Sequence, residues 1–281
     1  MNRGFASRRA PVLGLYASLV YAFLYFPIIV LIVYSFNGSG VGGFPPANWT
    51  LDWYRQLFAD GALWDAVLNS AIVAAIAVAL ALGLGLPAAL ALDRTDFPGK
   101  ALFRRLVLLP LILPGIITGL SLLMLFDGVG MNLSLVTITL GHGTALISVA
   151  TTEIFAGLQK LERAQEEASL DLGANHWKTF WRITLPNLRV SLVAAALLIF
   201  TLSLDEIAVS FFLIGRENTL PLEIWSRLRR GITPEINAIS TLILLFSIGT
   251  ILLWYRLRTR LQSSEHPSEP VARTPIEGEP A

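Results

Sequence analysis

Apolar runs long enough to cross a bilayer are the feature that most constrains this chain. About 20 consecutive apolar residues cross the hydrocarbon core of a membrane, and the sequence offers six runs of roughly that length. These runs cover residues 11–36, 64–92, 106–126, 133–157, 187–213 and 238–255. Only 15% of the residues are charged, whereas soluble domains carry about 25%. The sequence therefore predicts an all-α membrane protein in which six transmembrane helices form one domain over residues 11–257.

The two ends of the chain differ from the spans. Residues 1–10 carry three arginines ahead of the first run, as a signal peptide does, but that run is longer than the apolar core of a signal peptide. We therefore expect it to stay attached as a membrane helix. Residues 258–281 are rich in Pro, Glu and Ser, which is typical of a disordered tail.

The sequence lacks the residues of common catalytic and metal sites. Cysteine is absent, which excludes disulfides and thiolate metal sites, and the three histidines show no ligand spacing. No GxxxxGK[ST] phosphate-binding loop, GxSxG elbow or HExxH helix is present. A net charge of +1 does not indicate a nucleic-acid partner. We therefore expect a chain that is not an enzyme and binds no cofactor or metal itself, so that energy for transport must come from a partner or an ion gradient.

Positive charge is concentrated on one side of the six predicted spans. With six spans, both termini lie on the same side of the membrane as residues 93–105 and 158–189, and that side carries sixteen of the 21 Lys and Arg residues. Cytoplasmic segments carry the excess of Lys and Arg in membrane proteins. Both termini and the loop at 158–186 are therefore predicted to be cytoplasmic.

The third run is the least regular span, because Pro110, Pro114, Gly115 and Gly119 interrupt it. Such residues persist at membrane depth where neighbouring helices or a water-lined cavity satisfy the freed backbone groups. We expect this span inside the bundle, as a static kink or as a hinge.

The longest polar interruption runs from Leu161 to Arg189. A helix is predicted over 162–172, with an apolar stripe that includes Ala164 and Ala168. Gly173 occupies the position at which helices end, since glycine accepts a left-handed backbone, and Pro186 suits the first turn of the next span. Two interpretations remain open: an elbow that a partner protein contacts, or an amphipathic helix resting on lipid headgroups.

The spacing within this loop resembles the EAA loop of ABC importer permeases, whose pattern is EAA-x3-G-x9-I-x-L-P. The matching residues are Glu167, Ala168, Ser169, Gly173, Ile183, Leu185 and Pro186, with serine at 169 where alanine is usual. The resemblance implies the type I importer (MetI-like) permease fold in a bacterial inner membrane. It implies that the loop is a coupling helix for a cytoplasmic ATPase dimer, which holds ATP and Mg. It also implies a second permease subunit and a periplasmic or extracellular solute-binding protein.

Asp205 and Glu206 are the only adjacent carboxylates within a predicted span. Charged groups at membrane depth are costly and point to function. Helical spacing predicts that Asp205 shares a face with Thr201, and that Glu206 shares one with Ser203 and Ser210. This polar arc is a candidate substrate pathway for a cationic solute. The alternative is that the carboxylates bond a neighbouring helix or subunit.

Residues 200–238 resemble the second permease subunit of spermidine/putrescine importers, which shows a similar acidic pair in TLS-x-[DE]-[DE]. The resemblance implies a polyamine or related amine as substrate and a heterodimeric pore. Related permeases carry other small solutes, such as opines, phosphonates or amino-acid-like compounds, and these stay open. A rival from another class is an ion-coupled secondary transporter with Glu153 and the acidic pair as a proton relay.

Overall fold

The computed structural model describes residues 4–39, 45–231 and 233–263, and every regular element in these ranges is a helix. The nearest approach to a sheet in them is one isolated antiparallel bridge between Asn37 and Trp49. The chain forms two compact units, one from residues 1–57 with 233–281 and one from residues 58–232. Each unit is described by itself.

The first unit is built from the two ends of the chain. Helix α1 (Gly4–Tyr34) contacts helix α12 (Pro234–Ser263), and α2 (Asp52–Ala59) begins in this unit. The turn after α1 is held by Asn37, whose side-chain oxygen accepts from the backbone N–H of Ala47 at 3.1 Å and whose carbonyl accepts from the Trp53 indole at 2.9 Å. Most large apolar side chains of α1 are exposed.

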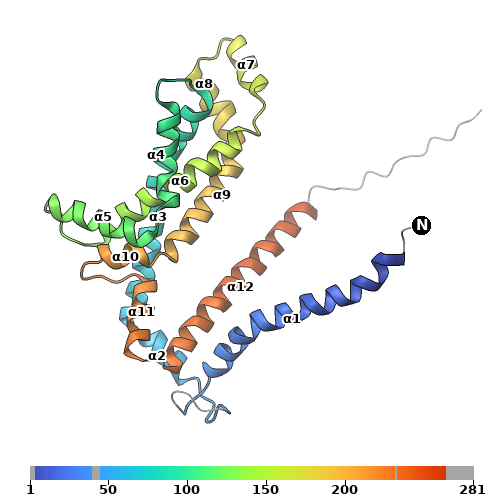
Figure 1. Cartoon of the computed structure of the whole chain (residues 1–281), viewed down its shortest axis with the longest axis vertical. Coiled ribbons are helices and arrows are strands. Elements are labelled where there is room, and N and C mark those ends of the chain that lie inside the picture. Colours follow the sequence, from blue (N-terminus) through green and yellow to red (C-terminus); the bar gives the residue numbers. More distant parts are fainter. Residues whose placement is uncertain (1–3, 40–44, 232, 264–281) are drawn as a thin grey trace, which may run out of the picture. The chain divides into compact units, whose positions relative to one another are not determined.

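The second unit holds the remaining helices, of which the α-helices are labelled in Figure 1. They are α3 (Gly61–Arg94), α4 (Lys100–Ile112), α5 (Gly115–Gly128), α6 (Leu135–Leu158), α7 (Arg163–Asp171), α8 (His176–Thr179), the π-helix η1 (Phe180–Thr184), α9 (Leu185–Leu204), α10 (Ala208–Leu213) and α11 (Leu220–Arg230). Helices α3, α6 and α9 pack against one another. The end that carries residues 158–186 is called the loop end, and the other is called the far end.

Small residues bring α3, α6 and α9 together. The buried face of α3 is mostly alanine, and the positions are Ala66, Ala74, Ala77, Ala81, Ala88 and Ala89. In lipid, helices associate through close packing, which small side chains allow. Ala81 packs in one layer with Ala150 of α6 and Ala195 of α9, and Ala89 packs in another, nearer the loop end.

Four described helical stretches are long and apolar enough to cross a membrane, and a bent pair adds a fifth. The four are Leu13–Tyr34, Gly61–Arg94, Leu135–Leu158 and His176–Leu204. Within α12, the apolar stretch Pro234–Gly249 is shorter than a full span. The all-helical membrane fold is as predicted, whereas the count of six spans stays a prediction. Helix α12 continues through residues 258–263 of the predicted tail, and residues 264–281 lie outside the described residues.

Two of the predicted spans are broken helices. The predicted span 106–126 is the pair α4 and α5, which meet at a bend of 107°. Pro114 explains this break, because a proline disfavours helical backbone at the residue before it, and Leu113 is extended (φ −74°, ψ 134°). The predicted span 187–213 stops at Leu204 and restarts at Ala208. The helical-wheel argument for Asp205 and Glu206 was therefore wrong, since both residues lie in the interruption.

At the far end, α11 is tied to the start of α3. Arg227 bonds both Asp60, at 2.7 Å, and Glu223, at 2.8 Å. Asp60 also caps α3 by accepting from the backbone N–H of Leu63. Partial burial opposes ionisation of Asp60, but the bonds from Arg227 and the backbone outweigh it and lower the pKa of this carboxyl below its ordinary value. These bonds thus join α11 to the start of α3 at the far end.

Candidate functional site

The two helix breaks meet at one place. A methyl group added at Gly115, the first residue of α5, would lie 3.1 Å from Cβ of Ala208 and 3.4 Å from Oε1 of Glu206. At Gly119, one turn further along α5, it would lie 3.1 Å from Cα of Val209 and 3.2 Å from the carbonyl oxygen of Ala208. The absence of side chains at these two glycines lets α5 lie directly on α10. Both interruptions of the helical ladder are therefore parts of one site.

The acidic pair divides into two different environments. Glu206 is half-buried, and its Oε1 accepts from the backbone N–H of Val209 at 2.9 Å, so it caps the first turn of α10. Asp205 is exposed at the C-terminal end of α9. Among the described residues, no side chain forms a hydrogen bond or ion pair with the Asp205 carboxylate. A carboxylate is unfavourable at a helix C-terminus, which carries partial negative charge.

His142 of α6 joins both sides of the break between α9 and α10. Its side chain is buried, with Nδ1 2.7 Å from Oγ of Ser203 and Nε2 2.8 Å from Oγ of Ser210. The Ser210 hydroxyl donates its hydrogen to the carbonyl oxygen of Glu206 at 2.9 Å, so it accepts from Nε2–H. In the neutral ring Nδ1 is then an acceptor, and Ser203 donates to it. This network fixes the position of Glu206.

The predicted pathway residues therefore hold different places. Ser203 and Ser210 are buried against His142, and the hydroxyl of Thr201 donates to the carbonyl of Leu197 on its own helix. Asp205 and Thr201 are exposed. His142 does not stand out in the sequence, because the three histidines lack the spacing of a metal site. The signal in the sequence for a polar network here was Ser203 and Ser210, which lie seven residues apart on either side of the acidic pair.

The loop 158–186 is an elbow of short helices. Helix α7 ends before Gly173, whose φ of +85° is left-handed, as the sequence predicted. Asn175 then caps α8 through the backbone N–H of Lys178. The chain passes through η1 into α9, with Pro186 in the first turn of α9. Leu185 begins α9, and Ile183, in η1, accepts from the side chain of Asn187 through its carbonyl at 2.9 Å.

One face of α7 is anchored and the other is open. Glu166 forms an ion pair with Arg94 of α3 at 2.8 Å and accepts from the Thr184 hydroxyl at 2.6 Å. Ser169 bonds Thr179 at 3.1 Å, so it also belongs to the anchored face. Glu167 and Ala168 are exposed on the other face. Of the first three motif residues, Glu167 and Ala168 therefore lie on the open face and Ser169 on the anchored face. The anchor at Glu166, one residue before the motif, was missed.

Apolar and aromatic side chains are exposed around the same elbow. Leu172 is 89% exposed and Trp177 is 68% exposed. The Trp177 ring lies 6.2 Å from the ring of Phe180 and 5.6 Å from that of Trp181, centroid to centroid. Large apolar side chains exposed together mark a site of contact with another protein or with a membrane. This open surface comprises Ala164, Glu167, Ala168, Leu172, Trp177 and Trp181.

Comparison with known proteins identifies the family. Residues 81–264 match the family model for the binding-protein-dependent transport system inner membrane component. The chain is 38% identical over 247 residues to the putrescine transport system permease protein PotI of Escherichia coli K12, covering 84% of this chain and 87% of PotI. It is 36% identical over 237 residues to the spermidine/putrescine transport system permease protein PotC of Haemophilus influenzae, covering 84% and 91%.

Solved structures confirm the predicted fold. A chain of a bacterial ABC transporter that imports the acidic polysaccharide alginate superposes with a TM-score of 0.66 at 18% identity, covering 92% of this chain and 96% of that one. A chain of an amino acid ABC transporter with histidines superposes with a TM-score of 0.54 at 18% identity, covering 74% and 99%. The chain therefore belongs to the binding-protein-dependent transport system inner membrane components, a family of multi-pass permeases of ABC importers.

Proposed function

We propose that this chain is the pore-forming subunit of an ATP-driven importer for polyamines, such as spermidine and putrescine, or for a related cationic amine. Two of its relatives bear permease names for these amines. The chain supplies half of the pore and pairs with a different second permease. A cytoplasmic ATPase dimer binds ATP and Mg, and a solute-binding protein outside delivers the substrate.

The observation that carries this proposal is Asp205 at the broken end of α9. The carboxylate is exposed and, among the described residues, has no hydrogen-bonding or ionic partner. It lies beside the last turn of α9, whose free carbonyl groups carry partial negative charge. Broken helices expose such backbone groups to substrates and ions in transporters. A carboxylate with adjacent carbonyls suits an ammonium group, which donates three hydrogen bonds and accepts none.

The remaining residues of the pathway position Asp205. Glu206 holds the start of α10, and Ser203 and Ser210 attach both sides of the break to His142. Thr201 is exposed one turn before Asp205 and extends the polar face of α9. We therefore assign substrate contact to Asp205 and a positioning role to Glu206.

The alternatives fit this arrangement less well. A phosphonate is anionic and would be repelled by Asp205, whereas opines and amino-acid-like solutes carry an amine and stay possible. A proton relay would need its carboxylates near one another. Glu153 lies beside Ile154, which packs against Leu188, and Asp205 is seventeen residues beyond Leu188, or about 25 Å along the helix axis.

Uptake of labelled putrescine and spermidine into cells that lack their own importers tests the substrate. We expect Asp205→Asn to weaken uptake, because a hydrogen bond between charged groups contributes about 1.5–3 kcal/mol, or about 10-fold to 100-fold in apparent affinity. Asp127→Asn makes the same chemical change at an exposed position of α5 and should leave uptake unchanged. Unchanged affinity in Asp205→Asn would remove Asp205 from the pathway.

The open surface of the elbow is the proposed docking site for the ATPase. Substituting Gly173 by leucine strains a residue with φ of +85° and should detach the ATPase while the chain stays in the membrane. The matched control is Gly130→Leu, since Gly130 has φ of +71° and lies in the turn before α6, at the far end. Co-purification of the ATPase should be lost only in the first variant. Normal co-purification with Gly173→Leu would contradict the docking site.

The energy source separates the importer from the ion-coupled rival. Uptake in cells depleted of ATP should stop even when the proton gradient is maintained. Uptake that survives ATP depletion and collapses with the proton gradient would favour a secondary transporter instead.

A further inference from the structure

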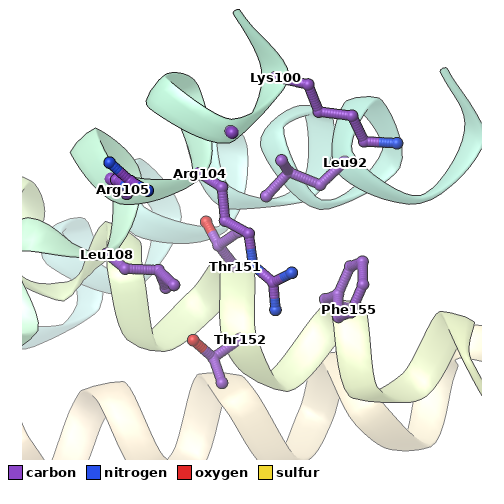
Figure 2. A pocket seen from close by; sticks show the side chains of 9 residues that line it. Leu92, Lys100, Arg104, Arg105, Leu108, Thr151, Thr152 and Phe155 are labelled. Atoms are coloured by element: carbon purple, nitrogen blue, oxygen red, sulfur yellow. The ribbon is translucent and has the colours of Figure 1, made fainter. Parts of the chain in front are cut away.

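A cavity of about 510 Å³ lies at the loop end, away from both helix breaks. It is formed by the end of α3, the first half of α4 and the last turns of α6 (Figure 2). The lining residues are Leu92, Lys100, Ala101, Arg104, Arg105, Leu108, Thr151, Thr152 and Phe155. Ligand pockets in proteins have volumes of about 300–1,000 Å³. The cavity is large enough for a small ligand, and neither the acidic pair nor the elbow contributes to its lining.

The charged residues of the lining are all basic. Arg104 points between α4 and α6 in Figure 2, with its guanidinium carbon 5.8 Å from the centre of the Phe155 ring. Across the described parts of the chain, neither Arg104 nor Arg105 pairs with a carboxylate. Lys100 bonds Asp96 at 2.9 Å, but the Asp96 side chain is fully exposed, and such surface ion pairs are weak. The cavity therefore presents three cations with little neutralising charge.

The rest of the lining is apolar, and charge and apolar surface follow one another along α4. Lys100, Arg104 and Leu108 are spaced four residues apart and so lie on one face of the helix. Lys100 is the first residue of α4, and Leu108 lies about 12 Å further along the helix axis. Leu92 and Phe155 add apolar surface from α3 and α6. The hydroxyls of Thr151 and Thr152 donate to carbonyls of their own helix.

We propose that this cavity binds the headgroup of an anionic phospholipid such as phosphatidylglycerol. The phosphate would lie among Lys100, Arg104 and Arg105 at the membrane interface, and the beginning of an acyl chain would lie along Leu108 and Leu92. Basic pockets between membrane helices bind anionic lipid headgroups in this way. A free phosphate would leave the apolar part of the cavity unused, and a cationic transport substrate would be repelled by the three basic residues.

A lipid bound in the cavity would lie close to the residues that anchor the elbow. Leu92 precedes Asp93, whose carboxylate accepts a hydrogen bond from the side-chain amide of Gln159 and forms an ion pair with Arg163, at the start of α7, at 3.6 Å. A lipid in the cavity would therefore contact the same turn of α3 that anchors the elbow. The inference concerns a site separate from the pathway, so it does not depend on which solute is carried.

Native mass spectrometry of the assembled importer tests the proposal, after extraction from vesicles of phosphatidylglycerol and phosphatidylcholine. We expect phosphatidylglycerol to remain bound to the wild type in preference to phosphatidylcholine. The triple substitution K100Q/R104Q/R105Q should weaken this retention about 100-fold, since each basic residue near an anionic lipid contributes roughly a factor of five. The charge-preserving variant K100R/R104K/R105K should retain the lipid, which controls for folding.

A lysine at the loop end that does not line the cavity provides the control for loss of charge. Lys160→Gln removes one positive charge at the loop end but outside the cavity, and it should not change lipid retention. Equal retention of phosphatidylglycerol by the triple variant would overturn the proposal. The proposal would also be overturned if the assembled wild-type importer held no phosphatidylglycerol, or if inorganic phosphate displaced the bound lipid. These results would assign the cavity to a subunit contact or to a free anion.

Discussion

His142 is the residue that most directly controls the shape of the candidate site. Substituting it by leucine removes two hydrogen bonds: the buried Ser203 hydroxyl loses its His142 partner, and the Ser210 hydroxyl keeps only its bond to the carbonyl of Glu206. A buried polar group that loses its partner costs about 1–3 kcal/mol. We therefore expect His142→Leu to lower the thermal unfolding temperature of the purified importer and to slow uptake, because the break between α9 and α10 is no longer held.

His176 provides the control for this prediction, since it is exposed in the elbow at the start of α8. His176→Leu should change the free energy of unfolding by no more than about 0.5 kcal/mol, as surface substitutions do, and so should leave the unfolding temperature nearly unchanged. His142→Asn should retain part of the stability, because an amide can both donate and accept. Equal unfolding temperatures for His142→Leu and the wild type would show that the network does not hold the break.

At the scale of single residues, the sequence identified the acidic residues of the site but not the groups around them. Asp205 and Glu206 were identified because carboxylates stand out in an apolar run. The different roles of the two residues depend on where α9 ends, which no glycine or proline between Leu204 and Ala208 marks. His142 lies 61 residues from Ser203 in the sequence, so their bond becomes visible only once α6 and α9 are packed together.

The contact between α5 and α10 is the element-scale feature that is most open to test. A Cβ at Gly119 would lie 3.0 Å from the ring of Phe212 and within 3.2 Å of the α10 backbone. Backbone atoms cannot move aside separately, so Gly119→Val should push α10 away and destabilise the bundle by about 1–3 kcal/mol, as overpacking does. Thermal unfolding and amine uptake of the variant measure the two consequences.

Gly128 lies on the same helix and supplies the matched control. A Cβ there would meet nothing within 4 Å, so Gly128→Val changes the same residue type without crowding a neighbour. Its unfolding temperature and its uptake should stay close to the wild type. If Gly119→Val transports as well as Gly128→Val, the close approach of α5 to α10 is not needed for the pathway.

At the scale of elements, the sequence predicted the long helices and the elbow well. It predicted the breaks within helices less well. Runs of Ala, Leu and Val predicted α3 and α6 to within a few residues. Pro114 indicated an irregular third span and explains its break, but neither the bend angle of 107° nor the packing of α5 on α10 follows from a local pattern. The elbow was predicted in order and direction because Gly173 and Pro186 carry backbone restrictions of their own.

On the scale of the whole molecule, apolar surface remains uncovered within each unit. In the first unit, the membrane stretch Leu13–Tyr34 has none of its most apolar window buried. In the second, α4 has no buried residue, and many large side chains of α9 are exposed. Exposed apolar side chains are expected against lipid, and part of this surface is available to the second permease subunit of the proposed importer.

The orientation in the membrane is the last property that the whole chain decides. Sixteen of the 21 Lys and Arg residues lie on the side predicted to be cytoplasmic. Arg227, which lies on the other side, forms ion pairs with Asp60 and Glu223, so its charge is largely offset there. We therefore expect the loop end to face the cytoplasm and the far end to face outward, where a solute-binding protein would approach.

The absence of native cysteine makes this orientation directly measurable. Single cysteines replace Lys178, exposed in the elbow, and Glu217, exposed before α11. A membrane-impermeant thiol reagent applied to cells with a permeabilised outer membrane should label Glu217→Cys at once, and Lys178→Cys only after lysis. Because the proposed docking site requires the elbow to face a cytoplasmic ATPase, the reverse labelling pattern would contradict the orientation and the docking site together.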